Sequence, residues 1–340
     1  MSKVNRKIIN DIKEKFDYEY YQKYLDGDIT RYELCNFIKC NDYQLGLILK
    51  ELDLKTRYQY LHDNTNHNFF NNIDKEEKSY ILGLYLADGC ITYPNRISFS
   101  QTEKDKELIY IVRKFLCPCC NISITKEKKI FNGKYIMHPM YSIHICSNEI
   151  HNTLESYGIG ERKTYFCDTD LSFIPKDQMI HFIRGYFDGD GTISLTKGTK
   201  SNGYKFENVT CRITSYKKDH LLIIHDFLLN EYNIHSNIIE ERRGNYIISI
   251  DRKKDFILLR DLLYKNATLY LKRKRDKFFD VSFDMIPLKR KVKLVNINTN
   301  EEKIYESLTS ISKVFNVSVT SIRNWMKNKK IINGYKIVEV

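Results

Sequence analysis

The sequence has no apolar run long enough to cross a bilayer, and no signal peptide stands at its start. From these absences we expect neither a membrane-spanning nor a secreted protein. Its nine cysteines are an odd number, and most stand singly among apolar neighbours. Because a disulfide scaffold uses paired cysteines, we expect reduced thiols in a soluble, intracellular protein of the cytoplasm, an organelle or the nucleoid.

The densest cysteine cluster, Cys117-Pro-Cys119-Cys120, lacks the ligand spacing of a zinc finger or zinc ribbon. It could still supply zinc ligands if His138, His144 or Cys146 completed the site. The alternative is a loop of reduced cysteines that follows a helix. We expect that loop and no bound zinc.

Acidic residues are outnumbered, since 43 Asp and Glu stand against 55 Lys and Arg, which gives a net charge of +12. Such a charge favours an anionic partner, either nucleic acid or a membrane surface. The surplus is concentrated in residues 252–293, which hold 14 Lys and Arg but 5 Asp and Glu. Its densest part is Lys272-Arg273-Lys274-Arg275, for which a solvated run, a nuclear import signal and phosphate contact are the candidate roles.

Two short stretches of the sequence resemble each other. Residues 81–89 read Ile-Leu-Gly-Leu-Tyr-Leu-Ala-Asp-Gly, and residues 183–191 read Ile-Arg-Gly-Tyr-Phe-Asp-Gly-Asp-Gly. The two stretches are separated by about the length of one small domain, which indicates that the chain holds two related halves. The first stretch is apolar almost all round, which is typical of a buried helix.

Small residues recur four apart in both stretches, at Gly83, Ala87, Gly185 and Gly189. This spacing places them along one side of each helix. By analogy with small-residue stripes in membrane helices, it predicts the close approach of two backbones. Gly89 and Gly191 follow the last helical residues, and we expect them to adopt the left-handed conformation that glycine accepts there.

Asp88 and Asp190 fall in the last turn of these helices, where the dipole is negative and free carbonyls point outward. Two carboxylates that converge there would repel, and a hard divalent cation would relieve the repulsion. A plain Asp-Gly turn is the alternative for one copy. The duplication favours a symmetric metal site made of Asp88, Asp190 and the carbonyls of Ala87 and Gly189.

Both stretches resemble the LAGLIDADG motif of homing endonucleases, in the form with two motifs in one chain, and the resemblance spans roughly residues 75–280. The first copy departs at Leu86, where the family has an acid that is not a metal ligand. The resemblance implies a saddle-shaped, monomeric enzyme that uses Mg²⁺ or another divalent cation such as Mn²⁺. Such an enzyme cuts both strands of a long double-stranded DNA site and leaves 3′ overhangs. The implied catalytic residues are Asp88, Asp190, Lys163 and Lys274, with the lysines near the scissile phosphates.

Each motif helix begins the same order of elements: the motif helix, two strands, a helix, two strands and a helix. We therefore expect half-domains over residues 75–168 and 175–280, each an αββαββα unit in an α+β protein with antiparallel sheets. The expected strands lie near 90–93, 96–101, 122–129, 140–147, 192–197, 206–215, 238–243 and 246–251.

One face of each expected sheet carries hydroxyls and basic groups, because side chains alternate along a strand. Such a face suits docking in a DNA major groove, and an ordinary solvated sheet face is the alternative. The residues expected to contact DNA there are Ser98, Ser100, Thr125, Ser142, Thr192, Ser194, Thr196 and Arg212. In the basic run, phosphate contacts are expected from Lys272, Arg273 and Arg275.

Two smaller modules are expected at the ends. Residues 1–62 are nearly neutral and helical, with a capping box at Thr30 and Glu33, and form either a helix-turn-helix or a helical hairpin packed on the body. Residues 290–340 resemble the small helix-turn-helix modules appended to homing nucleases, with serine-capped helices over 307–315 and 318–327. The residues of this module expected to face DNA are Ser321, Arg323, Asn324 and Lys327.

Three other functions share these sequence features. An RNA maturase would use the basic surface to assist group I intron folding. A non-catalytic DNA-binding regulator would have no need of two acidic motifs. An intein-borne nuclease is disfavoured because the chain lacks a nucleophilic first residue and a terminal His-Asn, so we expect a free-standing protein.

Overall fold

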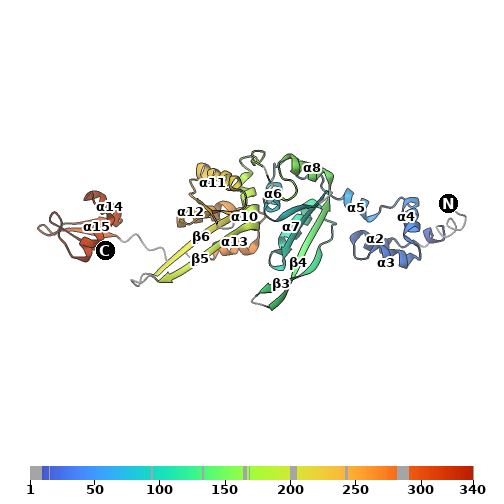
Figure 1. Ribbon diagram of the computed structural model, residues 1–340, viewed down its shortest axis with the longest axis horizontal. Helices are drawn as coiled ribbons and strands as arrows, with labels where there is room; N and C mark the ends of the chain where they lie inside the picture. Colours follow the sequence, from blue (N-terminus) through green and yellow to red (C-terminus); the bar gives the residue numbers. More distant parts are fainter. Residues whose placement is uncertain are drawn as a thin grey trace. The chain divides into compact units, whose positions relative to one another are not determined.

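The computed structural model describes residues 10–14, 16–92, 95–131, 134–163, 167, 169–199, 205–241, 244–281 and 291–339. The chain divides into two units, Met1–Asp280 and Val281–Val340 (Figure 1). Within these described ranges, no helix combines the length and the apolar character that a membrane crossing requires.

Short helices make up the N-terminal part of the larger unit: α2 (Tyr18–Asp26), α3 (Arg31–Ile38), α4 (Asp42–Glu51) and α5 (Arg57–Asp63). The predicted capping box begins α3, since Thr30 Oγ1 accepts from Glu33 N at 3.1 Å and the Glu33 carboxylate accepts from Thr30 N at 2.6 Å. Leu34, Leu45 and Ile48 are buried in a core of this part. Two helices joined by a turn are present, and DNA binding by them stays a prediction.

The first half-domain follows in the same unit. Its elements are α6 (Glu76–Asp88), β1 (Gly89–Thr92), β2 (Arg96–Thr102), η1 (Glu103–Asp105), α7 (Lys106–Leu116), β3 (Ser123–Phe131), β4 (Lys134–Cys146) and α8 (Asn148–Ser156). The second half-domain repeats this order of helices and strands. Its elements are α10 (Met179–Asp190), β5 (Gly191–Thr199), β6 (Lys205–Ser215), α11 (Lys218–Tyr232), β7 (Asn237–Glu240), β8 (Tyr246–Ile250), α12 (Lys253–Tyr264) and α13 (Lys272–Phe279).

The two half-domains have matching antiparallel sheets, with strand orders β1-β2-β4-β3 and β5-β6-β8-β7. The first strands also share their register, because Gly89 pairs with Phe99 and Gly191 pairs with Ile213. The predicted α+β class with antiparallel sheets is therefore confirmed.

Two features of the elements differ from the expected ones. β4 begins at Lys134 and not near residue 140, so that the β3–β4 hairpin is longer than expected. Residues 134–139 read Lys-Tyr-Ile-Met-His-Pro, and the proline at 139 argues against a strand across this stretch. The basic run from Lys272 is itself a helix, α13.

Helices α6 and α10 pack directly on each other through backbone (Figure 1). An ideal Cβ on Gly83 would lie 2.1 Å from Phe182 O, and one on Gly185 would lie 1.9 Å from Tyr80 O. Any side chain at either glycine would force the helices apart. Both glycines therefore lie at the axis between the half-domains.

The left-handed conformation expected at Gly89 and Gly191 is wrong. Both residues are extended, with φ of −72° and −80°, because each motif helix passes directly into a strand. Glycine is needed there for space: a Cβ on Gly89 would lie 2.1 Å from Tyr85 Cδ2, and one on Gly191 would lie 2.2 Å from Phe187 Cδ2.

The smaller unit has a three-stranded antiparallel sheet in the order β10-β9-β11 and two helices. The elements are β9 (Val292–Asn296), β10 (Glu302–Tyr305), α14 (Leu308–Val314), α15 (Val319–Lys327) and β11 (Tyr335–Glu339). Ser307 and Ser318 cap the two helices by accepting hydrogen bonds from Ser310 N and Ser321 N. Buried Ile311 and Ile322 join the helices to the sheet.

Candidate functional site

The last turns of α6 and α10 bring two acidic residues to one place. An ideal Cβ on Gly189 would lie 2.3 Å from Ala87 Cβ and 2.8 Å from Asp88 Oδ2. Asp88 at the end of α6 therefore lies against the residue that precedes Asp190 at the end of α10. The two carboxylates are neighbours across the helix pair.

A glutamine holds the first carboxylate. Gln101 Nε2 donates a hydrogen bond to Asp88 Oδ2 at 2.7 Å. Burial raises the pKa of Asp88, and the hydrogen bond from Gln101 opposes that rise. Our sequence reasoning missed Gln101. The strand register contained the signal, because Gln101 lies two residues beyond Phe99, the partner of Gly89.

The second carboxylate sits in a different environment. The Asp190 side chain is exposed on one side, yet the protein around it desolvates the carboxyl. This desolvation, together with the neighbouring Asp88 charge, raises the pKa of Asp190 to about 6, against the opposing charges of Lys163 and Lys274. Because the Asp88 charge raises the pKa of the neighbouring Asp190, the pair forms a site that favours added positive charge.

Each predicted lysine lies at the C-terminal end of one motif helix. Lys163 Nζ donates to Leu86 O at 2.7 Å and to Ala87 O at 3.0 Å. Lys274 Nζ donates to three carbonyl oxygens of α10, those of Phe187, Asp188 and Gly189, at 2.7, 2.7 and 2.8 Å. Burial lowers the pKa of both lysines, that of Lys274 to about 8. An ammonium at a helix C-terminus stabilises the dipole, so both lysines are positioned by the helices that carry the acids.

The donor set suits a hard divalent cation at its carboxylates, since carboxylate oxygens are ligands that Mg²⁺ prefers. The predicted carbonyl ligands are less free, because Ala87 O and Gly189 O each accept a lysine ammonium. Among the residues that the structure describes, no three His, Cys, Asp or Glu side chains gather into a group able to hold an ion. Any metal here would depend on Asp88 and Asp190.

Asp188 replaces the apolar Leu86 of the first motif and is fully buried. Its carboxylate accepts hydrogen bonds from Tyr80 OH at 2.7 Å, Tyr264 OH at 2.6 Å and Leu271 N at 2.7 Å. Leu271 immediately precedes α13. The buried carboxylate thus fixes the start of the helix that carries Lys274.

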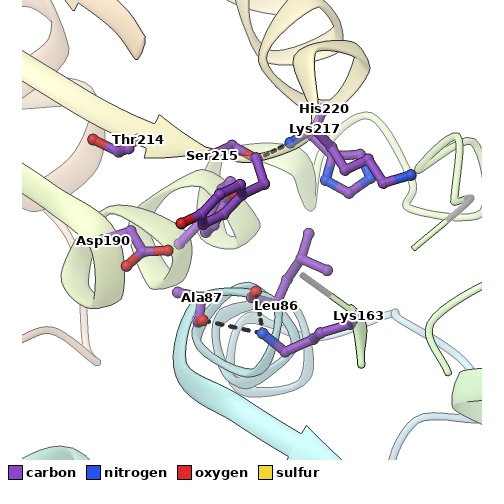
Figure 2. A pocket seen from close by; sticks show the side chains of 10 residues that line it. Leu86, Ala87, Lys163, Asp190, Thr214, Ser215, Lys217 and His220 are labelled. Carbon is purple, nitrogen blue, oxygen red and sulfur yellow. Dashed lines mark hydrogen bonds between the residues drawn. The ribbon is translucent and has the colours of Figure 1, made fainter. Parts of the chain in front are cut away.

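Asp190 lines two adjoining pockets. The first has Lys163 and Ala87 on one side and β6 with its following turn on the other, and Figure 2 shows Asp190 and Lys163 on opposite walls. Its lining residues are Leu86, Ala87, Lys163, Tyr186, Asp190, Thr214, Ser215, Tyr216, Lys217 and His220. The second pocket is lined by Arg273, Lys274 and Lys277 together with residues 189–193. Asp190 thus lies between two pockets whose basic side chains can attract an anionic group from either side.

His220 is a lining residue that our sequence reasoning did not single out. Its imidazole is buried, and burial with the nearby Lys217 charge lowers its pKa to about 4. The ring is therefore neutral at pH 7. It lies within an expected helical stretch, and no local pattern there distinguishes it from an ordinary core residue.

The strand residues expected to contact DNA share one face of each sheet. Thr192 pairs with Arg212, and Ser194 pairs with Thr210, in the second half-domain. In the first half-domain Ser100 Oγ and Ser142 Oγ hydrogen-bond at 2.8 Å, and Ser98 Oγ bonds His144 Nδ1 at 2.8 Å. The exposed members of the predicted set are Ser100, Thr125, Thr192, Ser194, Thr196 and Arg212, whereas Ser98 is half-buried and Ser142 is buried.

The basic residues of α13 have protein partners. Arg273 forms a bidentate pair with Asp105 of the first half-domain, at 2.5 and 2.8 Å. Lys272 is exposed and lies 3.6 Å from Asp276, and the Arg275 guanidinium lies over the Tyr270 ring. Of the three residues predicted to contact phosphate, Lys272 has the cationic group that is least engaged by other side chains.

In the smaller unit, the predicted DNA-facing residues lie on α15. Arg323, Asn324 and Lys327 are exposed. Ser321 is half-buried, and its Oγ bonds the capping Ser318 Oγ at 2.9 Å. The exposed residues of α15 thus include two cations and an amide, while Ser321 bonds the residue that caps the helix.

Comparison with known proteins gives one family match. The family model described as a LAGLIDADG-like domain matches residues 177–263. No curated protein matches the chain in sequence.

Solved structures with low sequence identity resemble the chain. Full-length DUF199/WhiA from Thermatoga maritima is 18% identical with a TM-score of 0.37, over 64% of this chain and 68% of that chain. The LAGLIDADG meganuclease I-AabMI bound to uncleaved DNA is 14% identical with a TM-score of 0.40, over 59% and 88%. The I-LtrWI LAGLIDADG homing endonuclease bound to target DNA is also 14% identical with a TM-score of 0.40, over 61% and 89%. The resemblance of the second motif is confirmed by the family model, which matches residues 177–263 and so includes α10 and Asp190.

Proposed function

We propose that the chain is a site-specific DNA endonuclease of the homing type. It would act as a monomer on a long double-stranded target, cut both strands with a divalent cation and leave 3′ overhangs. One observation carries the proposal: two helices in backbone contact end in adjacent carboxylates, Asp88 and Asp190, whose pKa values are raised. Two carboxylates that repel each other are favourable once a cation binds between them, and such perturbed acids are typical of functional sites.

Asp88 and Asp190 would hold Mg²⁺, with water and DNA phosphate as further ligands. When bound, such an ion supplies Lewis-acid chemistry and a more acidic water at a scissile phosphate. Lys163 and Lys274 would stabilise negative charge that develops on that phosphate. Each ammonium already bonds the helix end beside its acid, and Lys274 uses all three of its N–H donors there, so these lysines would act on the phosphate through their charge.

DNA recognition would use the polar sheet faces and the basic residues around them. Thr192, Ser194 and Arg212 are exposed on one face of the second sheet, where hydroxyl and guanidinium groups can reach base edges. Lys272 would contribute phosphate contacts, and Arg323 and Lys327 of the smaller unit would extend them. Binding should therefore weaken strongly with salt.

A non-catalytic DNA-binding protein on the same fold is the second candidate. It is favoured by the lysine ammoniums on Ala87 O and Gly189 O, since these contacts leave fewer oxygen ligands for an ion. The two candidates share the DNA surface and differ only in cleavage.

The test uses the DNA that flanks the gene, fused without the insert between the flanks, as an end-labelled duplex. Incubation with Mg²⁺ should yield two strand breaks offset to leave 3′ overhangs, and a chelator should abolish them. Asp88→Asn and Asp190→Asn should bind the same duplex without cutting both strands. Specific binding with no cleavage by the wild type under any divalent cation would favour the second candidate. Normal cleavage by either variant would contradict the proposed site.

A further inference from the structure

A second cluster of reactive groups lies at the turn that follows α7, away from the acidic pair. Cys117 Sγ lies 3.7 Å from Cys119 Sγ, and Cys120 Sγ donates to His144 O at 3.2 Å. Cys120 N donates to Cys117 O at 3.0 Å, which closes a four-residue turn. Cys117 and Cys120 also line one pocket, together with Leu61 and His62 of the N-terminal helices.

This turn is where the N-terminal helices meet the first half-domain. Asn66 N donates to Leu116 O at 2.8 Å, one residue before the cluster. Asn121 Nδ2 donates to Gly27 O at 3.1 Å, one residue after it. A covalent change among the cysteines would therefore act on the contact between these two parts of the larger unit.

The three thiols differ in acidity. Hydrogen bonds from Cys120, Thr65 and Cys119 lower the pKa of Cys117 to about 6 against the effect of burial. Burial, with the Cys117 charge, raises the pKa of Cys119 to about 11, and the hydrogen bond to Cys117 raises that of Cys120. The lowered pKa favours the thiolate at Cys117 over that at its two neighbours, and a thiolate is the form that attacks a disulfide.

We propose that Cys117 and Cys120 are a reversible dithiol–disulfide pair, with Cys117 as the attacking sulfur and a low-molecular-weight disulfide as the oxidant. The turn places their Cα atoms within about 7 Å of each other. A disulfide spans Cα separations of about 4.4–6.8 Å, so a small adjustment closes the bond. Their Cys-x-x-Cys spacing is that of redox-active pairs.

The reaction balances with glutathione disulfide. The Cys117 thiolate attacks one glutathione sulfur, forms a mixed disulfide and releases one glutathione thiolate. Cys120 then gives its proton to solvent and attacks Cys117 Sγ, which releases the second glutathione. Two protein thiols lose two electrons in total, and one glutathione disulfide is reduced to two thiols.

The experiment incubates the reduced full chain with excess oxidised glutathione, unfolds it in denaturant and blocks the remaining thiols with N-ethylmaleimide. The thiols that were protected are then reduced and labelled. Of the nine cysteines, Cys117 and Cys120 should carry the second label, and dithiothreitol before blocking should remove it. The chain contains its own matched control. Cys35 and Cys40 also share a hydrogen bond, but their pKa values are raised, so both should take the first label.

Two variants separate the roles in the cluster. Cys119→Ser should still form the bond, whereas Cys120→Ser should stop at one glutathione on Cys117. Circular dichroism checks that each variant folds, and the comparison of the two cysteine pairs within the wild type needs no variant at all. The proposal is overturned if all nine thiols of the oxidised chain take the first label, or if Cys35 and Cys40 become protected instead. Stoichiometric zinc that co-purifies and shields the cluster would also overturn it, in favour of a metal site.

Discussion

The two half-domains carry equivalent aspartates that have different neighbouring side chains. Gly89 pairs with Phe99 and Gly191 with Ile213, so Gln101 in the first half corresponds to Ser215 in the second. Gln101 donates to Asp88 at 2.7 Å, whereas Ser215 Oγ accepts from Lys217 N at 3.0 Å and bonds Tyr186. Within the part of the chain that the structure describes, no side chain donates a hydrogen bond to Asp190. The two halves share the acids and the small residues, and they differ in the groups beside them.

The lysines show a second contrast. Lys274 stands on α13, whose start is tied to the buried Asp188 through Leu271 N. The first motif has Leu86 at the position of Asp188, so among the residues that the structure describes no equivalent acid anchors Lys163. Lys163 bonds two helix-end carbonyls and Lys274 bonds three. The second half therefore holds its lysine more firmly.

The largest expected effect tests whether the two acids are equivalent despite these contrasts. Asp88→Asn and Asp190→Asn should each lower double-strand cleavage by about 10³-fold, because each removes one of two carboxylate ligands. DNA affinity should be unchanged or higher, since a negative charge is lost. Cleavage kinetics and fluorescence anisotropy measure the two quantities. If only one variant lost activity, the site would have a single working acid.

Substitution of the contact glycines should destabilise the chain equally in α6 and α10. Gly83→Ala and Gly185→Ala should each lower the free energy of unfolding by about 3 kcal/mol, because the new methyl group meets backbone oxygen. Gly46→Ala is the matched control in α4, where the nearest atom would be Arg31 Nη2 at 3.9 Å. It should stabilise by about 0.5–1 kcal/mol. Urea titration compares the three variants, and a harmless Gly185→Ala would contradict the close approach.

The groups beside the acids should make strand cleavage unequal. Gln101→Ala should slow one of the two nicking steps by about 10-fold, as for a group that orients a metal ligand. Ser215→Ala should change neither step by a comparable factor, because its hydroxyl bonds Tyr186 and Lys217 N. A supercoiled plasmid that carries the target measures both steps, since nicked circles should accumulate with Gln101→Ala alone. Equal accumulation with both variants would remove the contrast.

The smallest effect concerns pH. The pKa of Asp190 is about 6 in the folded chain against 3.8 for an ordinary aspartate, so the folded state binds a proton that the unfolded state does not. Without metal, the free energy of unfolding should therefore rise as the pH falls from 7 to 5. Asp190→Asn should reduce this rise but not abolish it, because the pKa of the buried Asp188 is also raised to about 6. Equilibrium unfolding in a chelating buffer measures the change. With metal, cleavage should decline over the same pH range because the carboxylate is lost.

Local patterns in the sequence predicted what depends on local chemistry. The Thr30–Glu33 capping box and the order of helices and strands follow from cap residues and periodicity. Gln101, His220 and the partners of Asp188 come from pairings between distant segments, on which periodicity is silent. The extended Gly89 illustrates the difference, since its need for glycine comes from the Tyr85 ring and not from its own backbone angles.

The buried Asp188 has a consequence for the symmetry between the two halves. The residue that corresponds to Tyr80 in the second motif is Phe182, which has no hydroxyl. A homodimer built from the second half alone would leave Asp188 short of one donor, and one built from the first half would leave Tyr80 OH without its acceptor. Each half therefore complements the other, and a symmetric dimer made from two copies of either half would lack this hydrogen bond.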